Sequence, residues 1–379
     1  MAVPHGKLPA WADYGLLPLI NVVVAFGVSG LVVLLAGESP VRAATLLVQG
    51  AFGSGQNIAY TLYYATSFIF TGLAVAVAFH GGLFNIGGEG QAYVGGLGVA
   101  LVCLSMDTLV PWYITFPVAI LGAAFAGAAW AFIPAVLQAK RGSHVVITTI
   151  MFNFIAASLM VYLLVGPLKP AGQMAPQTRT FFEGGQLPKL NWMLEAVGFS
   201  IRSSPLNISF LLAIVCAFLV WVLIWRTRLG YEIRTQGHSP KAARYAGIGE
   251  ARIVIITMMI SGALAGMMAL NPVMGDTNRL QLDFVTGAGF VGIAVALMGR
   301  SHPAGIVPAA ILFGMLYQGG AEIAFMMPNI SRDMIVIIQG LVILFAGALE
   351  HMFRPWLFMA FASLSPGSVG LGRAGREGA

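Results

Sequence analysis

The chain has 379 residues, of which 58% are hydrophobic and only 9% are charged, and it carries a formal net charge of +6. About a quarter of the residues of a soluble globular protein are charged, so this composition excludes that class and indicates a membrane protein. The positive charge does not indicate nucleic-acid binding, because the basic residues lie at the ends of apolar runs, as the positive-inside rule for membrane proteins requires.

Apolar runs close to 20 residues long recur along the chain, and a helix of that length crosses a bilayer core of about 30 Å. We expect an all-α polytopic membrane protein with about ten transmembrane helices. The expected helices cover residues 16–36, 60–80, 90–106, 112–136, 145–166, 206–225, 253–271, 284–299, 304–326 and 333–351. The first run is too long for the apolar core of a cleavable signal, so we expect it to remain as a helix.

The distribution of basic residues predicts the orientation. With the N-terminus inside, 13 of the 20 Lys and Arg residues lie in cytoplasmic segments and three lie in short external loops. Both termini are therefore expected in the cytoplasm, with a transmembrane domain over residues 1–362 and an external loop at 167–205. The tail at 363–379 offers little to bury and is expected to be disordered.

The first segment that interrupts the hydrophobic rhythm is GGLFNIGGEGQAYVGG, residues 81–96. Its glycines oppose a continuous helix, and irregular backbone at membrane depth is tolerated only inside protein or beside a water-filled cavity. We expect Asn85, Glu89 and Gln91 to line a path for a polar solute. The alternative is that the Glu89 carboxylate caps the N-terminus of a half-helix, and both roles can hold together.

Asn153 stands in the middle of the helix expected at 145–166. Its amide either lines the same path or forms a hydrogen bond between helices, which is the commoner use of such a residue. Among the aromatic residues near the breaks, Phe84 and Phe290 would suit stacking on a nucleobase or a sugar face, although most aromatic side chains only pack.

The segment 226–252 is the most polar part of the chain and carries six Lys or Arg residues. Gly237, Pro240 and Gly247 bracket a short helix expected over residues 241–246. Such a helix could lie on lipid headgroups and bind anionic lipid. Its compact frame of small residues instead favours insertion into a socket on a protein partner.

The segment GAGFVGIAVALMGRSHPAG, residues 287–305, is a second glycine-rich interruption in the other half of the chain. Broken or re-entrant helices at corresponding places in two halves indicate an inverted internal repeat with a transport path between the halves. Glycine also predicts close helix packing, with Gly262 and Gly266 in a GxxxG frame.

Several classes of site are not encoded. The sequence contains no phosphate-binding loop, no HExxH metal motif and no nucleophile elbow. Cys103 and Cys216 lie in apolar runs without a partner spacing, so no disulfide or metal framework is expected. We expect no catalytic residue, no metal, no cofactor and no nucleic-acid partner.

Four blocks together resemble one family, the permease subunits of bacterial ABC importers for nucleosides and simple sugars, which are relatives of the ribose and branched-chain amino acid permeases. The blocks occur in that family's order and are GLFNIGGEGQ (82–91), TTIMFNFIA (148–156), RTQGHSPKAARYAGI (234–248) and GFVGIAVALMGRSHPAG (289–305).

The resemblance implies a multi-pass protein of the bacterial cytoplasmic (inner) membrane, in which the loop at 226–252 carries a coupling helix that inserts into a cytoplasmic ATPase subunit. It implies contact with the ATPase by Gly237, Ala243, Arg244, Gly247 and Ile248. It also implies a second, different permease subunit, an external substrate-binding protein and ATP hydrolysis on the separate ATPase.

The form of the last block resembles nucleoside permeases more than ribose permeases, so the expected function is inward transport of nucleosides. A simple sugar such as ribose is the alternative solute. An ion-coupled secondary transporter is the alternative mechanism, because it would show the same broken helices and membrane carboxylate. The expected path residues are Phe84, Asn85, Glu89, Gln91, Asn153 and Phe290.

Overall fold

The computed structural model describes residues 16–196, 198, 204–330, 334–341, 344 and 357 of the chain. The chain divides into two compact units, one made of residues 1–44 with 324–379 and the other of residues 45–323. All the candidate site residues lie in the second unit. Within the first unit, the Asn329 amide donates to the Glu38 carboxylate over 3.0 Å, which joins the segment before α2 to the segment after α13.

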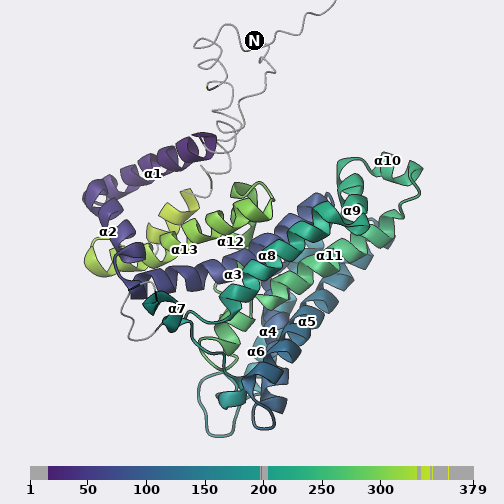
Figure 1. Cartoon of the computed structure of the whole chain (residues 1–379), viewed down its shortest axis with the longest axis horizontal. Helices are drawn as coiled ribbons and strands as arrows, with labels where there is room; N and C mark the ends of the chain where they lie inside the picture. Colours follow the sequence, from purple (N-terminus) through teal and green to yellow (C-terminus); the bar gives the residue numbers. More distant parts are fainter. Residues whose placement is uncertain are drawn as a thin grey trace, which may run out of the picture. The chain divides into compact units, whose positions relative to one another are not determined.

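The described elements are all helical, apart from two isolated bridges (Figure 1). The N-terminal helices are α1 (Leu17–Leu35), α2 (Pro40–Phe52), α3 (Gly55–His80), α4 (Gly88–Met106), α5 (Trp112–Arg141) and α6 (Val145–Val165). Two short elements follow, η2 (Glu183–Gly185) and α7 (Asn191–Glu195). The later helices are α8 (Ser209–Arg226), α9 (Arg228–His238), α10 (Pro240–Tyr245), α11 (Glu250–Met267), η3 (Leu270–Met274), α12 (Ala288–Met298) and α13 (Pro303–Met326).

The prediction of a polytopic helical membrane protein is confirmed, but the prediction of about ten spans is wrong for the part of the chain that the structure describes. Six of its helices are long and apolar enough to cross a membrane: α3, α5, α6, α8, α13 and the run Glu250–Met274. A seventh is present if the bent pair Val23–Leu35 and Pro40–Phe52 counts as one span.

The physical reasons for the lower number lie in the elements that were counted as spans. The run expected at 284–299 contains α12, which has 11 residues and covers only about 16 Å of a core about 30 Å thick. The run expected at 90–106 is α4, whose first turns are rich in glycine and polar residues. The tenth expected helix, at 333–351, lies mostly outside the described residues.

Helices α3 and α11 are the inner helices of the second unit. Their most apolar stretches are each 72% buried, whereas those of α5, α6 and α8 are at most 33% buried. Glycine allows this close packing, as the GxxxG frame predicted. A Cβ added at Gly266 would lie 3.1 Å from Gly127 Cα, and one added at Gly262 would lie 3.1 Å from the Gly127 carbonyl carbon. Backbones of α11 and α5 therefore touch, and larger side chains at these positions would separate the helices.

Candidate functional site

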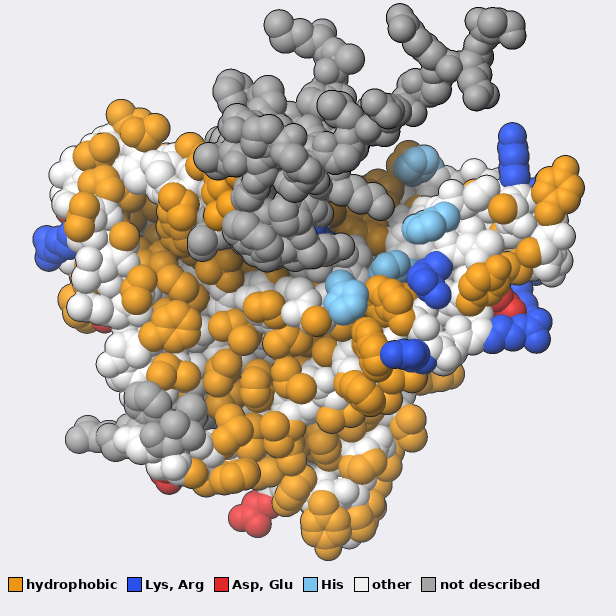
Figure 2. Space-filling view, turned by 45° about the horizontal axis from the view of Figure 1, so that its top comes forward, with side chains coloured by type: hydrophobic (Ala, Val, Ile, Leu, Met, Phe, Trp, Pro, Cys, Tyr) orange, Lys and Arg blue, Asp and Glu red, His pale blue; other side chains and the backbone are white. Residues whose placement is uncertain are grey.

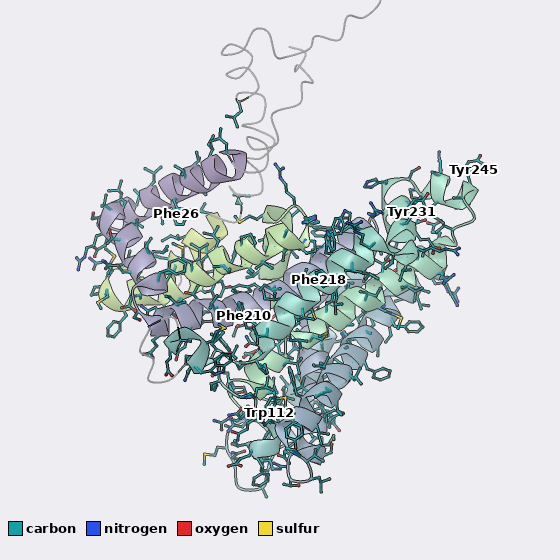
Figure 3. All side chains as sticks on the ribbon, viewed as in Figure 1. Phe26, Trp112, Phe210, Phe218, Tyr231 and Tyr245 are labelled. Atoms are coloured by element: carbon teal, nitrogen blue, oxygen red, sulfur yellow. The ribbon has the colours of Figure 1, made fainter. Side chains whose placement is uncertain are left out.

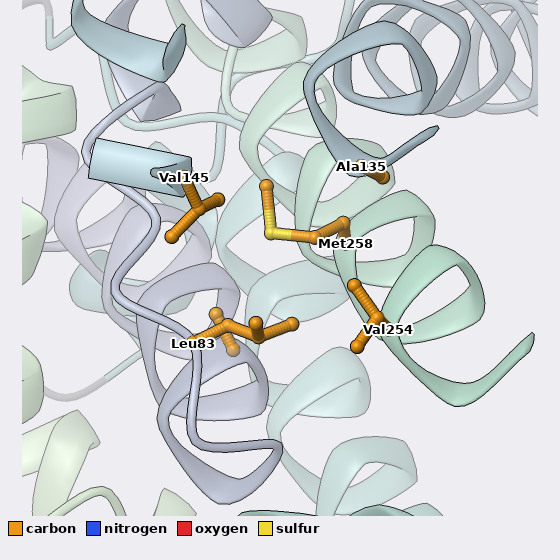
Figure 4. Close-up of a cluster of buried hydrophobic side chains, with 6 residues drawn as sticks. Leu83, Ala135, Val145, Val254 and Met258 are labelled. Atoms are coloured by element: carbon orange, nitrogen blue, oxygen red, sulfur yellow. The ribbon is translucent and has the colours of Figure 1, made fainter. Parts of the chain in front are cut away.

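The segment 81–87 connects α3 to α4 without forming a helix, as its glycines predicted. Gly82 has a φ of +70°, a left-handed conformation that residues with a Cβ rarely adopt. Leu83 anchors the segment in a buried apolar cluster. Figure 4 shows its side chain beside those of Val145, Val254 and Met258, which come from α6 and α11. This anchoring fixes the place at which the polar residues that follow enter the core.

The side chain of Asn85 is 1% exposed and fully engaged in hydrogen bonds. Its amide nitrogen donates to Gln91 Oε1 over 3.0 Å and to Ser261 Oγ over 2.9 Å. Its carbonyl oxygen accepts from the Gly87 backbone N–H over 2.9 Å and from Gln91 Nε2 over 3.2 Å. Ser261 in turn donates to the Ala74 carbonyl of α3. The network holds the start of α4 between α3 and α11, and it uses the polar groups of both Asn85 and Gln91 internally.

Asn153 joins the same break to α6. Its side-chain oxygen accepts from the Gly90 backbone N–H over 2.9 Å, and its nitrogen donates to the Ile86 carbonyl over 3.0 Å. The residue is only 7% exposed. Of the two roles considered for Asn153, these contacts favour the hydrogen bond between segments, because both of its polar atoms are occupied.

Glu89 connects the two glycine-rich breaks, although about 200 residues separate them in the sequence. Its Oε1 accepts from the Gly287 backbone N–H over 3.0 Å, and its Oε2 accepts from that of Gly289 over 2.9 Å. Gly287 is the N-cap residue of α12. The carboxylate therefore caps the N-terminus of a half-helix. There it accepts from N–H groups that have no partner within the helix, and the positive end of the helix dipole stabilises its negative charge.

The N-termini of α4 and α12 also meet through glycine backbones. A Cβ added at Gly88 would lie 3.6 Å from Gly289 Cα, and one added at Gly289 would lie 2.6 Å from Glu89 Cα. Only glycine fits at position 289. The sequence thus predicted both breaks, and the structure brings them together at the Glu89 carboxylate.

Phe84 and Phe290 are the two expected path residues with accessible side chains. They are 40% and 48% exposed, and Phe290 directly follows the Gly289 N–H that Glu89 holds. Phe84 also contacts Phe79, with ring centroids 5.4 Å apart. An accessible aromatic side chain therefore lies beside each break.

Asn271 forms a second buried polar junction that the sequence analysis did not single out. Its amide nitrogen donates to the Tyr63 carbonyl and to Ser67 Oγ, both over 2.9 Å. Its oxygen accepts from Asn207 Nδ2 over 2.9 Å and from Ser209 Oγ over 3.1 Å. The signal was a single Asn followed by Pro inside an apolar run. Asn271 ties η3 to α3 and α8.

The segment 226–252 forms two helices, α9 and α10, at one end of the second unit. The short helix expected over residues 241–246 is present as Pro240–Tyr245, and α9 was not expected. Ser239 caps α10 by accepting from the Ala242 N–H over 3.3 Å. Gly247 has a φ of +75°, and the Ile248 N–H returns to the Ala243 carbonyl over 3.0 Å, which ends the helix.

The residues implied as ATPase contacts do not share one environment. Ala243 is completely buried, and Ile248 is partly buried. Gly247 is exposed, and so is Arg244, which pairs with Glu250 over 3.2 Å. A Cβ at Gly237 would overlap the His80 carbonyl and lie 2.8 Å from Gly82 N, so Gly237 faces the rest of its own chain.

Tyr245 is the functional candidate that the sequence analysis missed. It is 96% exposed and lies at the tip of α10, which projects with α9 from the helices of the second unit (Figure 3). On the face shown in Figure 2, Lys, Arg and His side chains gather over α9 and α10, whereas hydrophobic side chains cover much of the remaining described surface. The signal was an aromatic residue within KAARYA, where its neighbours are small or charged.

An ion pair fixes part of the segment 167–205 to the C-terminal end of α4, away from Glu89. Arg179 donates from both terminal nitrogens to the Asp107 carboxylate, over 2.6 and 2.9 Å. The Phe182 backbone N–H donates to the same carboxylate over 2.9 Å. Burial raises the pKa of Asp107, but the hydrogen bonds from Arg179 and Phe182 outweigh it and hold that pKa below its ordinary value. The carboxylate is therefore ionised at neutral pH and anchors the segment.

We expect Asp107→Asn to lower the free energy of unfolding by about 2 kcal/mol, because the variant loses the charge of a bidentate pair. The figure is reduced for solvent screening, since the Arg179 side chain is 36% exposed. A pKa that is lower in the folded state stabilises the fold above the unfolded pKa, about 4, and this contribution disappears as the pH falls through the folded value. Unfolding in detergent should thus separate the variant from the wild type at pH 7, and the difference in free energy of unfolding should shrink as the pH falls below about 4. A difference that is as large at pH 3 as at pH 7 would contradict the assignment.

Comparison with known proteins places the chain among transport proteins. Residues 57–347 match the family described as the permease component of the branched-chain amino acid transport system. A guanosine ABC transporter permease of Bacillus subtilis, NupP, is 34% identical, with 88% of this chain and 93% of the relative covered. A nucleoside ABC transporter permease of Lactococcus lactis, NupB, is 35% identical over 80% and 83% of the two chains. A glucose ABC transporter permease of Haloferax volcanii, TsgB13, is 32% identical over 94% and 93%.

Proposed function

This chain belongs to the permease component family of branched-chain amino acid transport systems, and we propose that it moves nucleosides into the cell as one subunit of an ATP-driven importer. It is a multi-pass membrane protein and an ABC transporter permease. The observation that carries the nucleoside assignment is its likeness to the guanosine and nucleoside permeases along 88% and 80% of its length. Because the chain belongs to this family of ABC permeases, the alternative of an ion-coupled secondary transporter is set aside.

A simple sugar is the second candidate solute. The glucose permease relative covers 94% of this chain at 32% identity, close to the identity of the nucleoside relatives. Both kinds of solute carry several hydroxyl groups, but only a nucleoside carries a flat heterocycle. Exposed rings of Phe84 and Phe290 beside the two breaks support the nucleoside, because a heterocycle can stack on them.

In this proposal α9 and α10 lie in the cytoplasm, as the predicted orientation requires, and the ion pair of Asp107 and Arg179 lies outside. The membrane is the bacterial inner membrane, and both termini are cytoplasmic. The tip of α10 inserts into the ATPase subunit through Tyr245, Arg244 and Gly247, whose exposure supports this role. Ala243 and Ile248 shape α10 from its inner side.

The solute path runs past the two breaks that meet at Glu89. Phe84 and Phe290 offer their rings to the solute, while Asn85, Gln91 and Asn153 keep the breaks in place through internal hydrogen bonds. An external binding protein delivers the solute, and a second, different permease subunit completes the path. ATP binding stabilises one arrangement of the helices over the other, and this difference in binding drives the transition.

Competition for uptake tests the solute. Cells that express the complete transporter take up labelled guanosine, and excess unlabelled adenosine, uridine, glucose or ribose is added in turn. We expect the nucleosides to block uptake and the sugars to leave it unchanged. Uptake of labelled glucose is measured in a parallel assay, and uptake of glucose but not of guanosine that depends on this chain would assign the second candidate. Dependence on this chain for neither solute would contradict both.

A further inference from the structure

Gly237 makes a close backbone contact within its own chain, which a role in binding the ATPase does not explain. The resemblance implies contact with the ATPase, yet a Cβ at this position would overlap the His80 carbonyl oxygen. The approach is mutual, because a Cβ added at Gly82 would lie 3.1 Å from Gly237 Cα. The end of α9 therefore rests on the turn at 80–82, backbone against backbone. Such a contact transmits displacement directly, since no flexible side chain lies between the two segments.

His80 extends this contact to the other half of the unit. Its Nε2 donates to the Ser301 carbonyl over 3.0 Å, in the turn between α12 and α13. Trp225 of α8 packs against both His80 and His302, with ring centroids 5.0 and 4.7 Å away. The turn at 80–82 and the turn at 299–302 are thus held together beside the C-terminal end of α9.

From these two turns, two short stretches of chain lead to the Glu89 carboxylate. One follows the break from Gly82 to Glu89, and Leu83 fixes it in the core. The other follows α12 from the turn at 299–302 back to Gly287 and Gly289, where Glu89 accepts both N–H groups. Helix α12 is therefore held at one end by the Ser301 contact and at the other by Glu89.

We propose that the Gly237–Gly82 contact and the His80–Ser301 hydrogen bond form a transmission joint between the coupling segment and the two half-helices. The inference rests on the proposed function. Motion of α9 and α10 moves the turns at 80–82 and 299–302 together, and these turns shift the N-termini that meet at Glu89. Gly237 and His80 are positioning residues of this joint, and neither touches the ATPase or the solute.

Gly237→Ala and His80→Phe test the joint, with His80→Gln as the matched control. The alanine Cβ displaces α9 from the turn at 80–82. Phenylalanine keeps a ring beside Trp225 but removes the donor to Ser301, and glutamine supplies an amide donor instead. The complete transporter is isolated through a tag on this chain, and two quantities are measured: the amount of ATPase subunit bound and the uptake of labelled guanosine by the cells.

We expect Gly237→Ala to lower uptake by about tenfold and His80→Phe by about fivefold, within the range of coupling energies between sites. ATPase binding should remain as in the wild type, and His80→Gln should restore most of the uptake. Loss of ATPase together with uptake in Gly237→Ala would make Gly237 a docking residue and overturn the proposal. Normal uptake in both Gly237→Ala and His80→Phe, or a His80→Gln variant as impaired as His80→Phe, would also overturn it. Failure of the wild type to take up any nucleoside would instead refute the proposed function.

Discussion

The double variant Arg244→Glu, Tyr245→Ala is expected to lower uptake by at least about 100-fold, because it removes the anchor of the α10 tip and reverses the charge beside it. Tyr245 is 96% exposed in its own chain, so its replacement leaves the fold of the permease intact. A buried aromatic residue is typically worth about 2 kcal/mol or more at an interface. The basic segment 226–252 favours an acidic surface on the ATPase subunit. A glutamate at position 244 would be repelled by that surface.

The measurement is the amount of ATPase subunit that is isolated with the tagged permease, together with guanosine uptake. Tyr162→Ala is the matched control, because it also removes an exposed tyrosine, one that is 69% exposed and lies near the C-terminal end of α6 instead of in α10. That control should bind ATPase and transport as the wild type does. A double variant that keeps both ATPase and uptake would exclude the α10 tip as the docking element.

Replacement of Glu89 by alanine is expected to have the second largest effect. The carboxylate accepts from Gly287 and Gly289, and a hydrogen bond to a charged group is worth about 1.5–3 kcal/mol. Its loss leaves the first N–H groups of α12 without a partner in a site where Glu89 is only 8% exposed. We expect unfolding to become easier by about 3 kcal/mol and uptake to fall by at least about tenfold.

Glu89→Gln distinguishes capping from a charge-dependent role. Glutamine keeps one oxygen acceptor for a single N–H group and loses the charge, so its stability should lie between those of the wild type and Glu89→Ala. Both variants are compared by unfolding in detergent and by uptake. Wild-type stability in Glu89→Ala would show that the carboxylate does not hold α12.

Local patterns in the sequence predicted the individual helices well. The run expected at 145–166 is α6, Val145–Val165, and the run expected at 304–326 is α13, Pro303–Met326. Both are bounded by strong signals, since glycine or proline stands at their ends. The number of spans was wrong because an apolar run does not reveal that α12 has only 11 helical residues. The preceding residues at 275–287 reach α12 by irregular backbone rather than by helix.

Contacts between distant segments could not be predicted in the same way. The sequence indicated that Glu89 caps a half-helix, and the cap is on α12, whose N-terminus lies about 200 residues further along the chain. No local periodicity encodes that pairing. Gly237 shows the same limit, because no local pattern predicts that its backbone packs against Gly82, more than 150 residues earlier in the chain. Tyr245 was overlooked because exposure depends on how α10 projects.

Transport into proteoliposomes tests the central claim most directly. The purified complete transporter is reconstituted with ATP or ADP trapped inside the vesicles, and accumulation of labelled guanosine is followed after the external binding protein is added. We predict accumulation with ATP alone, and none with ADP even under an imposed proton or sodium gradient. Accumulation with ADP that follows the imposed gradient would contradict the account, because the chain would then work as an ion-coupled carrier.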